Sequence, residues 1–547
     1  MKPVIGMCGR RLRLAAGPAV LAAILVAAGA VYLASAPSSV SAHHLCPNTG
    51  SPFGAFNIDT YEAAQYKDLY ARTFELGAFN KIAPEQPGFA LPGIQTGPRS
   101  AGSSTVANPY IPPVILKSIA FLESGWAQAS YDPAVQYGEV GPVLSSHDCG
   151  YGLMQVTTGM QNVSNVPNIE QAMIGTHYAF NVARGARILA EKWNMSPEHR
   201  PIVGERDPNL LENWYYALWG YNGFAFSNHP LNPAYSTNRV PYSCGPTNDG
   251  YGHDRSQYPY QELVLGCVER PPTRAGSHLW NSIPVHLPEL NNPAFAGPLN
   301  TANWNACSYN LNCSPMDIPT PNAFHTDGTT ITVPREQVMG QPSMTLDQTA
   351  MSLSLNSSNP IATVSLKVNN AGTGILGYQA ITPSTWLKVA GGGAGVALGD
   401  ELGGYDGTIT LLADATGQAP GDYTGSVTVN SLYASGAPQT LTINMSLGPV
   451  TTPAPVLGKW GDNDCSGVPA DPVDALLVLR NDAGLVANTN GCPGMGWILG
   501  NLIWGDIDCM DGLIPTDALK TLRANLGEPI EQYGACPAVG ATVNLVP

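Results

Sequence analysis

Charged residues are scarce in this sequence, and basic ones are the scarcest. Only 12% of the 547 residues are charged, and 40 acidic residues stand against 25 lysines and arginines, giving a formal net charge of −15. This balance argues against nucleic acid or an anionic membrane surface as a partner. A low charge density is also common in proteins that work outside the cell.

Long apolar runs are confined to the N-terminus. Residues 14–36 carry no charge, follow the basic stretch "MCGRRLRL", and precede small residues at Val40 and Ala42. This pattern predicts a secretory signal peptide over residues 1–42. The run is also long enough to stay uncut as an N-terminal anchor, and only in that case do we expect contact with a membrane. In either case we expect residue 43 onward to be extracellular or at the cell surface.

The cysteine content fits an oxidising compartment. Of eleven cysteines, Cys8 lies in the leader, which leaves ten, an even number suited to disulfides. Six of them lie between residues 46 and 313 and allow fifteen pairings, of which proximity suggests only Cys307 with Cys313. These six are Cys46, Cys149, Cys244, Cys267, Cys307 and Cys313.

The length, with 59 glycines and 48 prolines, predicts a multidomain, loop-rich chain. Helical spacing of apolar residues in 58–80 and 168–194 predicts a mainly α domain at the start. A period of two, as in Leu441, Ile443, Met445 and Leu447, predicts an antiparallel β-sandwich further on. The expected boundaries are an α domain at 46–315, a Pro-rich linker at 316–339, the all-β sandwich at 340–448, a linker at 449–457, and a small α domain at 458–547.

The hexamer "FLESGW" at 121–126 places a carboxylate in an apolar helix. Pro112 and Pro113 can open that helix, and Ile115, Ile119, Leu122 and Trp126 form one buried stripe. Glu123 lies at the edge of the stripe, where partial desolvation should raise its pKa, as a general acid near neutral pH requires. The alternative is a glutamate that turns to solvent or caps a loop.

Two further stretches follow in order: "GYGLMQVT" at 150–157 and "ALWGYNG" at 217–223. Together with E-S-G-W they resemble the lytic transglycosylase (SLT) domain of the lysozyme superfamily, and "NVARGARIL" at 181–189 resembles that family's intervening helix. The resemblance covers roughly residues 105–225. It departs from the usual A-Y-N motif at Gly220, a small-for-small change.

The resemblance implies a single acid/base, Glu123, and no cofactor for catalysis. It would cleave the β-1,4 bond between N-acetylmuramic acid and N-acetylglucosamine in peptidoglycan and leave a 1,6-anhydromuramoyl product. No second carboxylate is needed, because the attacking C6 hydroxyl belongs to the substrate, unlike the paired-carboxylate scheme.

The same resemblance implies five further site residues. Ser124 would be a polar helper beside the acid, and Gln155 would contact the sugar, with Met154 lining the cleft. Tyr221 and Asn222 would hold Glu123 and the N-acetyl group of the substrate.

Two alternatives stay open on the residues. The loop after the first motif carries Asp132, Glu139 and Asp148, and goose-type lysozymes, which are similar in fold, use carboxylates near this location to activate water. Asp148 could therefore make the enzyme a lysozyme-like or chitinase-like hydrolase, although a solvated loop residue is the simpler interpretation. The chain could also be a non-catalytic glycan-binding protein. His147 is expected at the surface and His177 packed in a helix, while 225–315 is expected to wall the cleft.

The sandwich resembles the BACON family of immunoglobulin-like domains, on "VNNAGTGILGYQAITPSTWLKVAGGGAG" and "APGDYTGSVTVNS". Sugar binding is suspected for some members of that family. Trp386 and Tyr423 could stack on sugars, but we expect them to be aromatic residues of the core. The domain itself is interpreted first as a spacer.

The C-terminal ninety residues contain a repeat. "WGDNDCSG" at 460 recurs as "WGDIDCMDG" at 504, and "VDALLVLR" recurs as "TDALKTLR". These ninety residues include eleven acidic and four basic ones, and this excess of negative charge favours a cation-binding site. Each copy carries two cysteines, which predicts disulfides within each copy, Cys465–Cys492 and Cys509–Cys536.

This tail resembles a dockerin, a pair of calcium-binding loop–helix repeats whose usual partner is a cohesin. Calcium loops need oxygen ligands at positions 1, 3, 5 and 12, with glycine at 6. The first loop offers Asp462, Asp464, Ser466, Gly467 and Asp474, one residue longer than the pattern. The second offers Asp506, Asp508 and Asp517, with Met510 at position 5 and Asp511 and Gly512 displaced by one. The alternative is an acidic, solvated hairpin without metal.

Overall fold

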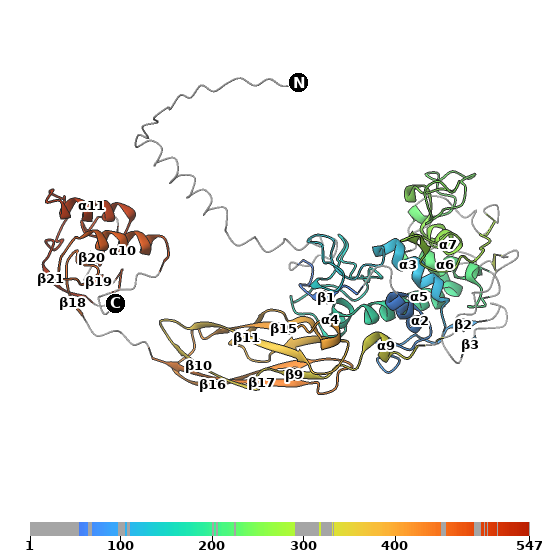
Figure 1. The fold of residues 1–547 in the computed structure, drawn as a ribbon, viewed down its shortest axis with the longest axis horizontal. Coiled ribbons are helices and arrows are strands. Elements are labelled where there is room, and N and C mark those ends of the chain that lie inside the picture. Colours follow the sequence, from blue (N-terminus) through green and yellow to red (C-terminus); the bar gives the residue numbers. More distant parts are fainter. Residues whose placement is uncertain are drawn as a thin grey trace, which may run out of the picture. The chain divides into compact units, whose positions relative to one another are not determined.

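The computed structural model describes residues 54–289, 317–318, 331 and 333–545, apart from gaps at 64–67, 97–103, 107–109, 200–201, 204–205, 224–225, 450–455, 486–493, 497, 500–501 and 511. It contains both helices and several β-sheets, so the chain is multidomain (Figure 1). One compact unit holds most of the chain up to residue 444, and the other holds 353–361, 415–423 and the region from 445. The leader, Cys46, Cys307 and Cys313 lie outside the described residues. Within those residues, no helix has the length and apolar character needed to cross a membrane.

The first region, residues 54–289, is mainly helical. Helix α3 packs against α2 and α7, and α5 packs against α2, α4 and α6. The helices are α2 (Asp68–Ala78), α3 (Pro113–Ser124), α4 (Ile169–Thr176), α5 (Tyr178–His199), α6 (Tyr215–Tyr221) and α7 (Tyr260–Glu269), with 3-10 turns at Leu211–Trp214, Phe226–Asn228 and Arg255–Gln257. Short strand pairs join its loops: β1 (Asp59–Tyr61) with β4 (Val140–Pro142), β2 (Gln95–Thr96) with β3 (Ser104–Thr105), β5 (Ile202–Val203) with β8 (Asp317–Ile318), and β6 (Thr273–Arg274) with β7 (Ser277–His278).

Helix α3 begins as predicted, with Pro112 at its N-cap and Pro113 as its first residue. The predicted helix over 58–80 is shorter, because residues 59–61 pair with β4 as a strand. The predicted helix over 168–194 is two helices, broken at His177. The backbone there is extended, and the His177 Nδ1 accepts the Ala179 N–H at 3.0 Å. His177 thus satisfies a donor at the start of α5 as a helix cap does.

Residues 344–448 form two sheets, of five and four strands, that pack as a β-sandwich. Every second residue of β17 is buried, including Leu441, Ile443, Met445 and Leu447, as the period of two predicts. The five-stranded sheet has the order β10-β17-β16-β12-β14, and the four-stranded sheet has the order β13-β15-β11-β9. The strands are β9 (Met344–Leu346), β10 (Ala350–Asn356), β11 (Ile361–Asn370), β12 (Ile375–Ile381), β13 (Leu387–Gly391), β14 (Ala394–Leu398), β15 (Gly407–Asp414), β16 (Gly421–Asn430) and β17 (Gln439–Gly448).

Strands β12 and β14 break this alternation. Residues 375–380 and 394–398 are all buried, as in a strand covered on both faces. One face lies in the sandwich, and α4 and β1 of the helical region contact these strands. The Gln379 side chain donates to the Pro167 carbonyl at 2.6 Å. One face of β12 and β14 is therefore covered by the helical region, a contact that the interpretation of the domain as a spacer does not predict.

The end of the expected linker 316–339 also joins this core. Residues Glu336–Met339 form the short helix α9, in which Val338 and Met339 are buried. The Tyr178 hydroxyl donates to the Val338 carbonyl at 2.9 Å. Trp386 is buried in the sandwich, in line with its interpretation as a core aromatic.

In the described part of the C-terminal region, 456–545, two helices pack together through Ala475, Val478 and Ala518. Each helix begins at a proline, as helix starts favour. Trp460 and Trp504, at equivalent positions of the repeat, meet edge to face at 5.8 Å. The elements are α10 (Pro472–Asp482), α11 (Pro515–Asn525), the strand pair β18 (Val456–Lys459) with β21 (Thr542–Leu545), and the pair β19 (Ile498–Leu499) with β20 (Leu502–Ile503).

Candidate functional site

Glu123 lies in the last turn of α3, and the residues after it form a tight turn. Gly125 takes the left-handed conformation at the helix C-cap, with φ of 59°. Trp126 follows with φ of 63°, and its buried indole donates to the Lys117 carbonyl at 2.8 Å. That ring stacks on Trp280 at 5.5 Å. The turn therefore fixes the end of α3 and the direction of the glutamate.

The Glu123 carboxyl is half-buried and accepts a hydrogen bond from the Tyr260 hydroxyl at 2.5 Å. Burial raises the pKa of Glu123 above its ordinary value of 4.5, and the charge of Asp148 raises it further. The Tyr260 hydrogen bond and the positive charge of Arg255 act in the opposite direction, and burial prevails. A raised pKa on a carboxyl that borders a cavity is what a general acid needs.

A cavity of about 450 Å³ opens beside Glu123, and it is lined by all three motifs. Glu123, Gln155, Tyr221 and Asn222, which the sequence predicts as site residues, are brought together there. The other lining residues are Ser146, Asp148, Val156, Thr157, Thr158, Ile188, Lys192, Gly220 and Gly223.

Hydrogen bonds from three other elements fix the loop 150–157 beside the acid. The Ser124 hydroxyl lies 2.8 Å from the Leu153 carbonyl, and the Tyr221 hydroxyl donates to the Met154 carbonyl at 2.8 Å. From α5, the Asn181 amide accepts the Met154 N–H at 2.8 Å and donates to the Tyr151 carbonyl at 2.7 Å. The motifs are therefore one interlocked structure, in which each holds the backbone of the next.

The expected roles of Ser124 and Met154 need correction. Both side chains are buried, and neither borders the cavity. The Ser124 hydroxyl bonds to the backbone carbonyls of Ala120 and Leu153, so it ties α3 to the loop. The Met154 side chain packs against Gly185 of α5. A β-carbon at position 185 would lie only 2.6 Å from the β-carbon of Met154. The glycine in "NVARGARIL" is thus required for the loop to approach the helix.

The roles of Tyr221 and Gln155 also become more specific. The Tyr221 hydroxyl bonds to Met154 and not to Glu123, so the holding role expected of Tyr221 falls to Tyr260. Gln155 has a positive φ of 46°, rare for a residue with a side chain, and its amide donates to the Gly152 carbonyl at 2.9 Å. Asn222 accepts a 2.8 Å hydrogen bond from the Asn228 amide.

Sequence reasoning missed Tyr260 as a site residue. It opens α7, in the segment expected only to wall the cleft, and its backbone N–H donates to the Asn228 side chain at 3.0 Å. A disulfide joins Cys244 to Cys267 and ties α7 to the preceding loop. Tyr260 belongs to none of the three motifs, and the sequence "YPYQEL" predicts only the start of an apolar helix.

Glu62 is a second missed residue. It is buried and accepts hydrogen bonds from the Tyr70 hydroxyl (2.7 Å) and from the backbone N–H groups of Gln128 and Ala129 (both 2.9 Å). Burial raises its pKa above the ordinary value of 4.5. Glu62 therefore supports the backbone just after the Glu123 turn from inside the core.

The other candidate side chains differ in exposure. Asp132, Glu139 and His147 are exposed. Asp148 is exposed too, but it borders the cavity and accepts a hydrogen bond from the Ser146 hydroxyl at 2.5 Å. His177 is fully buried, and burial lowers its pKa to about 3, so it is packed as expected.

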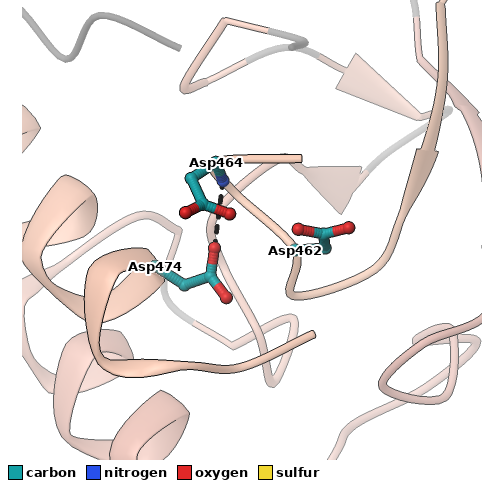
Figure 2. A group of neighbouring side chains, drawn as sticks. All are labelled: Asp462, Asp464 and Asp474. Atoms are coloured by element: carbon teal, nitrogen blue, oxygen red, sulfur yellow. Dashed lines mark hydrogen bonds between the residues drawn. The ribbon is translucent and has the colours of Figure 1, made fainter. Parts of the chain in front are cut away.

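Among the described residues, the C-terminal region contains two acidic clusters. Figure 2 shows the first, formed by Asp462, Asp464 and Asp474, whose oxygens lie within 4.8 Å of one another. Asp474 accepts the Asp464 N–H at 3.0 Å, and burial raises its pKa to about 7. Ser466 is exposed, and its hydroxyl lies 3.5 Å from Asp471, outside this group of three.

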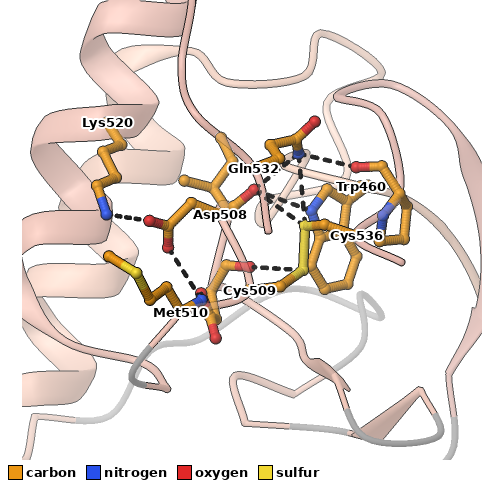
Figure 3. Close-up of a disulfide and its surroundings, with 10 residues drawn as sticks. Trp460, Asp508, Cys509, Met510, Lys520, Gln532 and Cys536 are labelled. Atoms are coloured by element: carbon orange, nitrogen blue, oxygen red, sulfur yellow. Dashed lines mark hydrogen bonds and ion pairs between the residues drawn. A yellow bond between two sulfur atoms is a disulfide. The ribbon is translucent and has the colours of Figure 1, made fainter. Parts of the chain in front are cut away.

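The second cluster contains Asp506, Asp508 and Asp517, again with oxygens within 4.8 Å of one another. Burial raises the pKa of Asp517 to about 7 and that of Asp506 to about 6, and neighbouring carboxylates act in the same direction. Lys520 of α11 pairs with Asp508 (Figure 3). Asp511 lies outside the described residues.

Both clusters fit a hard cation such as calcium, because all their candidate ligands are carboxylate oxygens. Asp517 is fully buried, and its Oδ1 has no hydrogen-bond partner in the described part of the chain. A buried carboxylate oxygen without a partner is costly unless a cation completes it. Calcium would be held by these two groups of three aspartates.

A disulfide joins Cys509 to Cys536, as the repeat predicts (Figure 3). It holds the segment after α11 against the second acidic cluster, where the Asp508 carbonyl accepts the Tyr533 N–H at 3.0 Å. Cys465 is also disulfide-bonded, while Cys492 lies outside the described residues.

Comparisons with known proteins do not assign the chain to a family. No family model and no curated protein matches it. Among solved structures, a Bacteroides ovatus GH5 xyloglucanase is 18% identical over 20% of this chain and 20% of its own, with a TM-score of 0.15. A protein of unknown function from Porphyromonas gingivalis W83 is 11% identical over 20% of this chain and 47% of its own, at 0.17. Vibrio cholerae VesB protease is 17% identical over 19% and 32%, at 0.15. Likeness at this level carries no argument about fold or function.

Proposed function

We propose that the chain is a secreted enzyme that cleaves peptidoglycan by lytic transglycosylation, with Glu123 as its acid/base. The observation that carries the proposal is the cavity itself. It places a carboxyl of raised pKa beside Gln155, Tyr221 and Asn222. The resemblance to the SLT family of lysozyme-like domains assigns roles to these same residues, which lie far apart in the sequence.

The first step is proton donation. Protonated Glu123 gives its proton to the glycosidic oxygen between N-acetylmuramic acid and N-acetylglucosamine, and the bond from that oxygen to C1 breaks. Tyr260 holds Oε1, so Oε2 is the oxygen left for the substrate. The carboxylate that forms is stabilised by the Tyr260 hydrogen bond and by the positive charge of Arg255, both of which lower its pKa.

The second step uses the same carboxylate as a base. Glu123 takes the proton of the muramoyl C6 hydroxyl while that oxygen attacks C1, which closes the 1,6-anhydro ring and regenerates the acid. No water enters the balance, so the two products together have the mass of the substrate. Gln155 and Asn222 present amides to the cavity and can bind the sugar and its N-acetyl group.

A hydrolase is the second candidate, because Asp148 borders the same cavity. A water activated by Asp148 would replace the C6 hydroxyl as nucleophile. Mass analysis of products from purified peptidoglycan separates the two. Anhydromuramoyl ends, one water lighter than hydrolytic ends, support transglycosylation, whereas reducing muramic acid ends that vanish in Asp148→Asn support hydrolysis. A protein that binds the glycan and yields neither product is a binding module.

For the remaining regions, we propose an immunoglobulin-like, BACON-type sandwich and a dockerin-type calcium module that binds a cohesin-bearing scaffold. The two acidic clusters and the repeated cysteines support the latter. Export by the N-terminal leader would place the whole chain at the cell surface or outside the cell.

A further inference from the structure

The second acidic cluster is paired with a lysine of α11. Lys520, in the second turn of α11, places its ammonium on Asp508 (Figure 3). The Asp508 side chain is 1% exposed and that of Lys520 is 26% exposed, so the pair is shielded from solvent on the carboxylate side. The ammonium thus lies beside the second cluster, whose three carboxylates have oxygens within 4.8 Å of one another.

The repeat itself supplies the comparison. When "VDALLVLR" at 473–480 is aligned with "TDALKTLR" at 516–523, Asp517 matches Asp474 and Lys520 matches Leu477. Leu477 is buried and carries no charge. The first cluster therefore has an apolar side chain where the second has a cation.

We infer that Lys520 is an internal counter-cation of the second cluster, which competes with calcium for Asp508 and makes the second loop the weaker of the two calcium sites. This inference rests on the proposed calcium binding. Three carboxylates within 4.8 Å repel one another, and a cation among them relieves that repulsion.

Two consequences follow. Without metal, Lys520 stabilises the second copy, while the first copy has no lysine at the matching position. With metal, a calcium ion bound by Asp508 must displace the ammonium or lie beside a like charge. Calcium binding at the second loop is therefore weakened by the cost of breaking that pair.

The test uses the full secreted chain and titrates calcium by calorimetry, in an Asp462→Asn background that removes the first site from view. Lys520→Leu, which copies the first repeat, should tighten the second site roughly tenfold, the scale set by a partly buried ion pair. The same variant should melt at a lower temperature in chelator. Lys520→Gln removes the charge with a polar side chain and should behave alike if the leucine disturbs folding. Lys520→Arg keeps the charge and should match the parent.

Each outcome decides something different. If both neutral variants bind calcium as the parent does, and melt as it does in chelator, Lys520 is a surface pair and the inference is wrong. If calcium binds to no variant and not to the wild-type chain either, the proposed calcium module itself is wrong, and the inference falls with it.

Discussion

The hydroxyl of Tyr260 donates a 2.5 Å hydrogen bond to Oε1 of Glu123, although 137 residues separate them in the chain. The bond joins α3 to α7, and α7 in turn is tied to its preceding loop by the Cys244–Cys267 disulfide. The segment after the third motif is thus part of the candidate site. It both positions the carboxyl and opposes the pKa rise that burial causes.

Glu123→Gln should abolish the clearing of purified peptidoglycan while preserving glycan binding. The amide keeps the shape of the side chain but has no transferable proton, and losing an acid/base costs at least about 10²–10⁴-fold. Binding to sedimented peptidoglycan supplies the control for folding. Clearing at a rate near that of the wild type would remove Glu123 from the mechanism.

The same variant should also change stability with pH. The folded pKa of Glu123 is raised, so the stability it contributes is complete below its ordinary value of 4.5 and is lost as pH rises through the folded value. Glu123→Gln should therefore melt above the wild type at pH 7 to 8 and equal to it near pH 4. Equal melting at both pH values would contradict the raised pKa.

Tyr260→Phe and Asp148→Asn should shift the pH profile of activity in opposite directions. Glu123 is active as an acid when protonated, so activity falls as pH rises through its pKa. The Tyr260 hydrogen bond lowers this pKa, so Tyr260→Phe should move the alkaline limb of the profile to higher pH. The Asp148 charge raises this pKa, so Asp148→Asn should move the alkaline limb to lower pH. Rate losses without limb shifts would mean that both residues act only through structure.

Glu123, Gln155, Tyr221 and Asn222 lie in short motifs of fixed order, and the sequence therefore predicted that they come together at one cavity. It did not predict that Ser124 and Met154 face inward. A motif records which residues are needed, and a buried hydroxyl that holds a backbone carbonyl is needed as much as one that binds substrate. Tyr260 and Glu62 act through contacts distant in sequence, for which one sequence carries no local signal.

The domain organisation was likewise predicted only where the sequence carries a local pattern. Period-two alternation predicted the sandwich strands, and the repeat predicted the Cys509–Cys536 disulfide. The contact between β12 and α4 was missed, since a fully buried strand reads as a plain apolar run. His177 was expected within one continuous helix. The helical spacing of apolar residues continues past it, so the sequence does not show that His177 caps a second helix.

Replacing Cys509 and Cys536 by serine should destabilise the C-terminal region selectively. The disulfide closes a loop with a sequence separation of 27, for which chain entropy gives about 3–4 kcal/mol. Calorimetry of the full chain should show one transition moved to lower temperature in calcium, with peptidoglycan cleavage retained. Peptide mapping of the wild type should find Cys465 linked to Cys492, and a link to any other cysteine would refute pairing within each copy.

Removing the sandwich should disable the helical region, because the two share a core. A chain ending at 339 would expose the faces of α4 and α5 that β12, β14 and Tyr433 cover, including Phe180. It should be poorly soluble and melt lower than a chain ending at 449, which should keep full activity. Equal activity and stability of the two truncations would show that the shared core is dispensable.

His177 should make this shared core sensitive to acid. Its ring is fully buried, packs at 5.5 Å from Tyr433 of the sandwich, and uses Nδ1 to accept the Ala179 N–H. Burial lowers its pKa from 6.5 to about 3, so its stability contribution is complete above 6.5 and is lost as pH falls from there toward 3. His177→Asn is the matched variant, because asparagine can still accept a hydrogen bond from the start of α5 but gains no charge. It should melt below the wild type at pH 7.5, since the ring packing is lost, yet lose less stability between pH 6.5 and 4.5. Parallel loss of stability in both proteins over that range would show that other groups cause the acid sensitivity.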